Sequence, residues 1–115
     1  MSAHDDGALA VREIADIAPK LAALTDQVVF GDVWERPGLS KRDRSLITVA
    51  ALVALYRTEQ LPGHLRRALD NGLTQDEIAE AITHLAFYTG WPNAFTAITL
   101  AKPVFHLPQR TNGEA

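Results

Sequence analysis

Residues 46–55 read Leu-Ile-Thr-Val-Ala-Ala-Leu-Val-Ala-Leu, and Thr48 is the only one of these side chains that is not apolar. Ser40, shortly before the run, is a good N-cap, and Asp43 follows near the positive end of the helix dipole. We therefore predict a helix from Ser40 to about Thr58. Because the run is apolar all round rather than along one stripe, a monomer of 115 residues could hardly bury it, and we expect a homo-oligomer.

The chain on both sides of this run shows the same helical periodicity. Apolar residues recur at three- and four-residue spacing, and no stretch alternates strictly over the length of a strand. The first predicted helix covers about residues 8–29 and is kinked or split at Pro19. The third runs from about Leu61 to Gly72, a residue that suits the left-handed position after a helix. The pattern predicts an all-α fold of about five helices.

A capping box marks the start of the fourth predicted helix. Thr74 and Glu77 have the spacing at which each satisfies a backbone donor of the other. This helix continues to Thr89, where Gly90-Trp91-Pro92 breaks it. A fifth helix follows from Pro92 to about Phe105.

Composition limits the classes of protein and of partner. The length of 115 residues fits one domain, which we place at residues 8–107 between a disordered lead (1–7) and a loose polar tail (108–115). A net charge of −3 provides no positive field for nucleic acid. No cysteine is present, which excludes disulfides, thiolate metal sites and thiol nucleophiles. No secretory signal or membrane span is recognisable, so a cytoplasmic protein without a membrane partner is expected.

His64 and a stripe on the fourth helix are candidates for chemistry. His64 falls beside the apolar face of its helix, where it is either a half-buried histidine bonded to a carbonyl or a general acid. Glu77, Glu80, His84 and Tyr88 share one stripe, which is either a solvated helix face or a proton-transfer chain. Both alternatives stay open for each.

Arg44 and two tryptophans are candidates for ligand binding. Arg44 stands in the first turn of its helix, where the dipole disfavours a cation. It either binds a carboxylate or forms an ion pair with Asp43, Glu35 or a neighbouring subunit. Trp34 and Trp91 either wall a small-molecule site or pack in the core. No two of the four histidines have metal-ligand spacing, so no metal is expected.

Several short motifs are spread over much of the chain. They are Phe30-Gly31-Asp32-Val33-Trp34, Arg36-Pro37-Gly38-Leu39, Arg44-Ser45-Leu46-Ile47-Thr48, His64-Leu65 with Ala68-Leu69, Gly72-Leu73-Thr74, Glu77-Ile78 with Glu80, and Tyr88-Thr89-Gly90-Trp91-Pro92. With them, the chain resembles the carboxymuconolactone decarboxylase family over roughly residues 20–106. The resemblance implies the all-α fold of the alkylhydroperoxidase-D-like (AhpD-like) proteins, assembled as a homohexamer or as trimers with active sites near subunit contacts.

The resemblance also implies an activity. The redox branch of the family carries a Cys-x-x-Cys pair before a histidine; if that histidine is His64, the cysteine positions hold Arg57 and Gln60, which cannot form thiolates. A thiol peroxidase is thereby disfavoured. The lyase branch implies a cofactor-free carboxy-lyase that decarboxylates a small lactone acid in aromatic catabolism. The alternative is a non-catalytic or ligand-binding helical oligomer of the same fold.

Such a decarboxylation needs three groups. They are a cation or donor at the developing oxyanion, an acid that protonates carbon, and an apolar slot for the departing carboxylate. The expected roles are anion binding and oxyanion stabilisation for Arg44 and His64, proton donation for His84 oriented by Glu80, and substrate contact for Trp34, Tyr88 and Trp91. Because a short turn joins their helices, we expect His64 and His84 to share one pocket.

Overall fold

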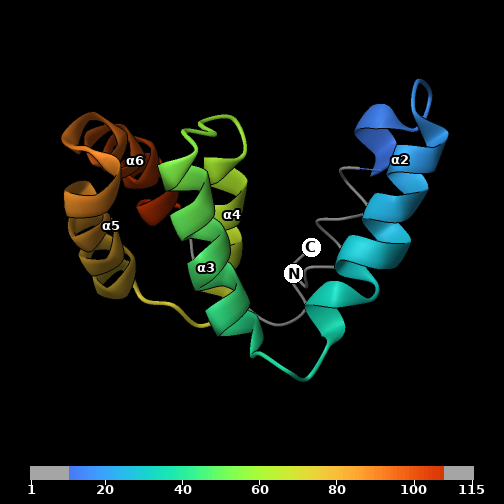
Figure 1. Cartoon of the computed structure of the whole chain (residues 1–115), viewed down its shortest axis with the longest axis horizontal. Helices are drawn as coiled ribbons and strands as arrows, with labels where there is room; N and C mark the ends of the chain where they lie inside the picture. The colour runs from blue at the N-terminus through green and yellow to red at the C-terminus, as the bar shows by residue number, and fades with distance from the viewer. Residues whose placement is uncertain (1–10, 108–115) are drawn as a thin grey trace. The chain divides into compact units, whose positions relative to one another are not determined.

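The computed structural model describes residues 11–107, which form helices and no strand (Figure 1). In chain order the helices are α2 (Pro19–Leu24), the π-helix η1 (Thr25–Phe30), the 3-10 helix η2 (Val33–Glu35), α3 (Lys41–Ala54), α4 (Leu61–Asp70), α5 (Gln75–Thr89) and α6 (Trp91–Phe105). The all-α prediction is confirmed. No helix in the described residues has the length and apolar character needed to cross a membrane. The described residues divide into two compact units, residues 11–41 and residues 42–107.

The described part of the first unit shows the predicted break at Pro19. The backbone turns over residues 15–17, and α2 then begins with Pro19 in its first turn. A proline fits there because the first N–H groups of a helix have no partner within it. Further on, the buried rings of Phe30 and Trp34 stack with their centroids 6.1 Å apart. Residues 8–10 of the predicted first helix lie outside the described residues.

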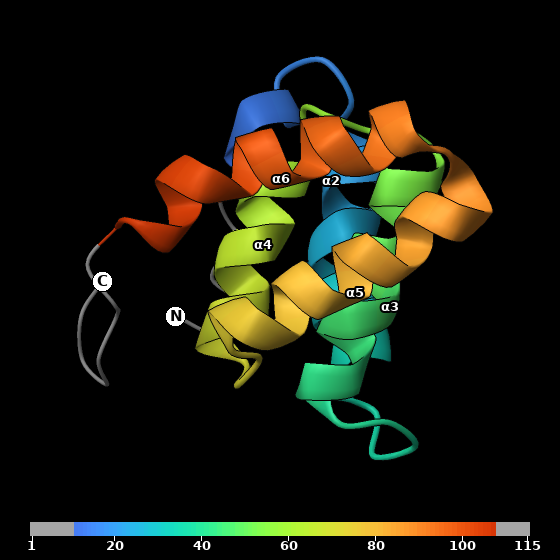
Figure 2. The same cartoon turned by 90° about the vertical axis from the view of Figure 1, so that its left-hand side faces the viewer.

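The core of the second unit is built around α6, which packs against both α4 and α5 (Figure 2). Its contact face carries Ala94, Ala97 and Ala101, spaced three and four residues apart so that they lie on one side of the helix. These small side chains meet Leu65 of α4 and Ile82 of α5, both fully buried. The predicted boundaries of α5 and α6 agree with the structure to within one residue.

The predicted end of α3 at Thr58 is wrong, because the helix ends at Ala54. Tyr56 takes a left-handed conformation with φ 57°, and the Arg57 N–H donates to the Leu52 carbonyl at 2.9 Å. This is a Schellman ending without the usual glycine. The Asn93 amide of α6 also donates to the Val53 carbonyl at 2.9 Å. A residue 40 positions away thus caps the helix, which no local pattern could indicate.

The turn between α4 and α5 matches the prediction. Gly72 has φ 105°, its N–H donates to the Leu69 carbonyl at 3.1 Å, and the Leu73 N–H donates to the Ala68 carbonyl at 2.9 Å. The predicted capping box is present, since the Thr74 hydroxyl accepts from the N–H of the third residue of α5. Both helix ends at this turn are therefore defined by local sequence.

Candidate functional site

An open groove of about 500 Å³ lies between α3 and α5. Its apolar lining consists of Leu46, Ala50, Leu73, Ala81 and Leu85. Its polar lining consists of Arg42, Glu77, Glu80 and His84. The apolar residues of α3 come from the run that decides the fold, and Glu80 and His84 come from the stripe predicted on the fourth helix. The groove therefore combines an apolar surface with a cation, two carboxylates and an imidazole.

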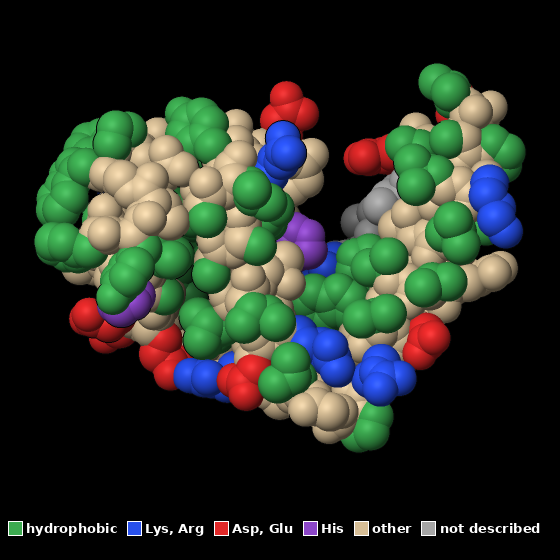
Figure 3. Space-filling model, in the orientation of Figure 1, with side chains coloured by type: hydrophobic (Ala, Val, Ile, Leu, Met, Phe, Trp, Pro, Cys, Tyr) green, Lys and Arg blue, Asp and Glu red, His purple; other side chains and the backbone are tan. Residues whose placement is uncertain are grey.

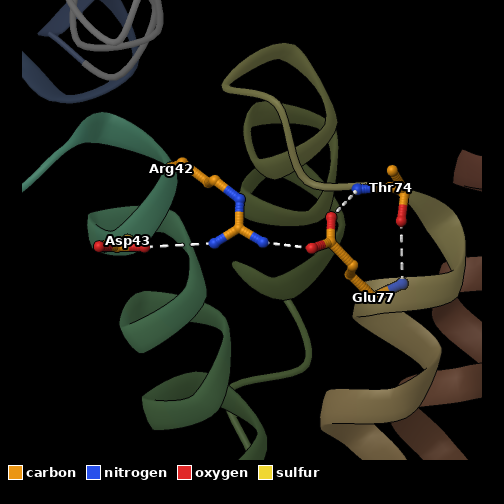
Figure 4. Close-up of polar contacts among 4 residues, drawn as sticks. All are labelled: Arg42, Asp43, Thr74 and Glu77. Atoms are coloured by element: carbon orange, nitrogen blue, oxygen red, sulfur yellow. Dashed lines mark hydrogen bonds and ion pairs between the residues drawn. The ribbon is translucent and has the colours of Figure 1, made fainter.

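Arg42 connects the two walls of the groove at one end (Figure 4). Its guanidinium donates to the carboxylate of Asp43, its neighbour on α3, at 3.2 Å. It also pairs with Glu77 of α5. These side chains are 40–51% exposed, so the pairs are screened by water and add little to stability. Their effect is to hold a cation at the rim.

Glu77 has two roles at this end of the groove. One carboxylate oxygen accepts from the Thr74 N–H at 2.9 Å, and the other pairs with Arg42 (Figure 4). The pKa of Glu77 is lowered from its ordinary value of 4.5. The largest cause is the backbone hydrogen bond from Thr74; desolvation opposes it, and the hydrogen bond and charge of Arg42 lower the pKa further. Glu77 is thus a carboxylate at neutral pH that both caps α5 and orients Arg42.

The structure brings together two of the three predicted catalytic residues. Glu80 and His84 both line the groove, at the i,i+4 spacing of one helix face. The imidazole of His84 also contacts the ring of Tyr88, with centroids 4.9 Å apart and planes tilted by 30°. Tyr88 is 76% exposed and is not among the groove-lining residues.

Arg42, and not Arg44, is the arginine that lines the groove. Arg42, Leu46 and Ala50 follow one another at four-residue intervals, so they lie along one face of α3. Arg44 is two residues on, which places it on another side of α3, and it does not line the groove. The sequence prediction missed Arg42, although the four-residue spacing that joins it to Leu46 was available as a signal.

His64 of α4 is not among the groove-lining residues either. It is half-buried, and its Nδ1 lies 3.4 Å from Nη1 of Arg67, one turn further along α4. Arg67 is a buried charged residue, only 5% exposed. A pocket shared by His64 and His84 stays a prediction.

The two tryptophans lie in different surroundings. Trp91 lines a second hollow of about 180 Å³ between α5 and α6, next to Phe95 and in edge-to-face contact with Phe87. Figure 3 shows apolar side chains gathered over these two helices, and Phe87, Trp91 and Phe95 are among the most exposed of them. Trp34, in the other unit, is buried against Phe30. A role of either tryptophan in substrate contact stays a prediction.

Metal ligation has no support within residues 11–107, because nowhere in that range do three His, Asp or Glu side chains come close enough to hold an ion. The groove itself offers two carboxylates and one imidazole along α5, and one of those carboxylates is engaged by Arg42. What this arrangement can do chemically is hold a small apolar acid, exchange a proton with it through His84, and attract an anionic group towards Arg42.

Comparisons with known proteins identify the family of this chain. Residues 19–103 match the model of the carboxymuconolactone decarboxylase family. The chain is 46% identical over 76 residues to a 4-carboxymuconolactone decarboxylase of Acinetobacter baylyi, covering 66% of this chain and 57% of that protein. It is 37% identical over 79 residues to the nitrosuccinic acid decarboxylase npaB of Metarhizium robertsii, covering 69% of this chain and 55% of that protein.

A third relative, an uncharacterized 15.0 kDa protein of Paracoccus denitrificans, is 30% identical over 97 residues, which cover 83% of this chain and 72% of that protein. The matches to the two named decarboxylases span little more than half the length of those two proteins. The family model covers most of this chain and includes every residue that lines the groove. The chain belongs to the carboxymuconolactone decarboxylase family.

Proposed function

We propose that this chain is a decarboxylase that removes carbon dioxide from a small carboxylic acid without a cofactor. The observation that carries the proposal is the groove between α3 and α5, in which Glu80 and His84 stand beside an apolar surface. The names of two relatives, both decarboxylases, support it. So does the absence of cysteine, because the thiol chemistry of the redox branch has no nucleophile here.

The substrate class follows from what the two relatives' substrates share. By their names, one relative acts on 4-carboxymuconolactone and the other on nitrosuccinic acid. In each acid an electron acceptor, an unsaturated lactone carbonyl or a nitro group, is placed to take up the electron pair left on carbon when a carboxylate departs. When the carbon–carbon bond to that carboxylate breaks, its electron pair moves onto the acceptor oxygens and carbon dioxide leaves. A proton then adds to carbon. The substrate itself is the electron sink, so no cofactor is required.

The groove suits both steps of this reaction. An apolar wall such as Leu46 and Leu85 destabilises a localised carboxylate more than the transition state, in which the charge is spread over the acceptor. His84 supplies the proton to carbon, and Glu80, one turn earlier on the same helix face, orients the imidazole. Arg42 attracts a second, retained carboxylate of the substrate, in competition with Glu77.

The remaining predicted residues stay part of the proposal. Arg44 and His64 do not line the groove of their own chain, and we propose that they bind the anion and stabilise the oxyanion near a subunit contact. We likewise propose that Trp34, Tyr88 and Trp91 contact the substrate. We further propose that residues 8–107 form the family domain and that it acts as a homohexamer or trimer. The exposed rings of Phe87 and Phe95 support an oligomer, because large exposed apolar patches on a soluble domain usually mark an interface. Sedimentation at micromolar concentration tests this, and a stable monomer would contradict it.

The direct test is turnover. Purified protein is incubated with 4-carboxymuconolactone and, separately, with nitrosuccinic acid, and carbon dioxide and the decarboxylated product are measured. We expect release from at least one substrate and a loss of about 100-fold or more in His84→Ala, the contribution typical of a general acid. His106→Ala, which removes an exposed histidine outside the groove, is the matched control. Binding of both acids without turnover would favour the ligand-binding alternative.

A further inference from the structure

We infer that Arg67 holds His64 as the neutral imidazole with its proton on Nε2, so that His64 acts as a hydrogen-bond donor rather than as the proton donor. The observation is the contact between Nη1 of Arg67 and Nδ1 of His64, 3.4 Å apart on α4. The two residues are three positions apart, which places their side chains on one face of the helix.

The chemistry of the two side chains decides which of them donates the hydrogen bond. A guanidinium has N–H donors and no acceptor, and it stays protonated in proteins. A hydrogen bond between the two groups therefore requires Nδ1 of His64 to be unprotonated and to accept. A neutral imidazole that accepts at Nδ1 carries its hydrogen on Nε2. An Nδ1–H tautomer or an imidazolium would point hydrogen at hydrogen and break the contact.

Burial makes this arrangement persistent. Arg67 is only 5% exposed, and its neighbours in the sequence Leu65 and Ala68 are fully buried. Each acceptor that a buried guanidinium finds lowers the cost of burying its charge, so the folded state favours the form of His64 that accepts.

If the proposed function holds, this tautomer gives the two histidines different roles in the reaction. A neutral imidazole with Nε2–H can stabilise a developing oxyanion by donating a hydrogen bond, and it does not need to change its charge to do so. His84, exposed on α5 beside Glu80, is then the group that delivers the proton to carbon. Arg67 is a positioning residue that acts through His64.

The first test does not depend on turnover. The protein labelled with ¹⁵N in its histidines is studied by NMR at neutral pH through the couplings between ring nitrogens and ring protons, with His64→Gln used to assign the signals. We expect His64 to show one hydrogen-bearing Nε2 and one unprotonated Nδ1, with widely separated resonances. An Nδ1–H ring, a charged ring, or ring-nitrogen signals averaged by exchange between tautomers would overturn the inference.

The second test asks whether Arg67 is the cause. In Arg67→Met the resonances of the two ring nitrogens of His64 should move closer together, because the tautomers begin to exchange. Arg66→Met, which removes the neighbouring partly buried guanidinium but not the contact to Nδ1, is the matched control and should leave the spectrum of His64 unchanged. A folded Arg67→Met protein with an unchanged His64 spectrum would show that another group sets the tautomer. Arg67→Lys provides a second variant that retains the charge.

The rate of decarboxylation provides a third, separate test. If the protein decarboxylates either acid, Arg67→Met should lower kcat about tenfold, less than the loss of about 100-fold that removal of an oxyanion donor causes, because His64 is still present. The KM should change little. Failure of the wild-type protein to release carbon dioxide would sink the proposed function and leave the NMR result for Arg67 and His64 to be judged by itself.

Discussion

Helices α4 and α5 follow each other directly and each carries one histidine, yet they place it in opposite surroundings. His64 of α4 is half-buried and touches a buried arginine. His84 of α5 is exposed, lines an open groove, and touches the ring of Tyr88. The difference shows that two successive helices can place the same residue type against a buried charge in one case and against an open groove in the other.

The largest expected effect tests the burial of α4. Leu65, next to His64, is fully buried, and Leu65→Ala should lower the free energy of unfolding by about 2–5 kcal/mol. Phe87→Ala on α5, where the ring is 76% exposed, should cost about 1 kcal/mol or less. Urea unfolding at several protein concentrations measures both. Equal losses would mean that the face of α5 is as well covered as α4.

The next effect separates the two histidines by chemical rescue. His84→Ala and His64→Ala should each reduce kcat about 100-fold, through loss of the proton donor and of the oxyanion donor respectively. Added imidazole should restore part of the activity of His84→Ala, because the groove is open to solvent. It should not restore His64→Ala. Rescue of both variants, or of His64→Ala alone, would contradict the division of roles.

Replacing either of two glycines near α4 by alanine should change the stability of the protein, in opposite directions. Gly72 has φ 105°, and although a Cβ there meets nothing within 4 Å, an alanine would be strained by about 1–2 kcal/mol. Gly63 lies inside α4 in equally open space, so Gly63→Ala should stabilise the protein by about 0.5–1 kcal/mol. Thermal unfolding of both variants measures the difference. A stabilised Gly72→Ala would show that the turn can open without cost.

A smaller effect tests the start of α5. Thr74→Ala removes the hydroxyl that accepts from the N–H of Glu77 and should cost about 1 kcal/mol. Thr74→Ser keeps that oxygen and should stay close to the wild type. Denaturant midpoints measure the pair, and equal losses in both variants would point to the lost methyl group rather than to the cap.

The smallest effect concerns the charge of Glu77. Because its pKa lies below the ordinary value of 4.5, the charged carboxylate stabilises the folded state. That contribution is complete above pH 4.5 and disappears as the pH falls through the lowered pKa. Glu77→Gln keeps the capping geometry but removes the charge, so it should be less stable than the wild type at neutral pH and equal to it in acid. A stability difference between the wild type and Glu77→Gln that grows as the pH falls would contradict this prediction.

Much of the fold could be predicted because its signals are local. Pro19, the glycine at position 72 and the capping box from Thr74 to Glu77 each act on backbone groups within a few residues, and the structure has the expected breaks there. The end of α3 could not be predicted in this way. Tyr56 occupies the position where a glycine is usual, and the helix carbonyls are satisfied by Asn93 from α6.

The candidate site was predicted in part. The i,i+4 spacing placed Glu80 and His84 on one face, and both line the groove. Choosing Arg44 over Arg42 missed the arginine at the rim, because the dipole argument applies to every residue of the first turn and does not say which face of α3 meets α5. Arg67 gave no signal, since a charged residue in a helix is ordinarily exposed.

By itself the sequence determined an all-α chain without thiol chemistry, together with the family motifs. These follow from periodicity, helix caps and residue types, which are properties of neighbouring residues. Only the tertiary structure decided that α3 faces α5 across a groove, that Arg42 meets Glu77, and that Arg67 is buried beside His64. Those outcomes depend on which helix faces pack together. Packing is set by contacts between residues far apart in the chain, such as the 35 positions that separate Arg42 from Glu77.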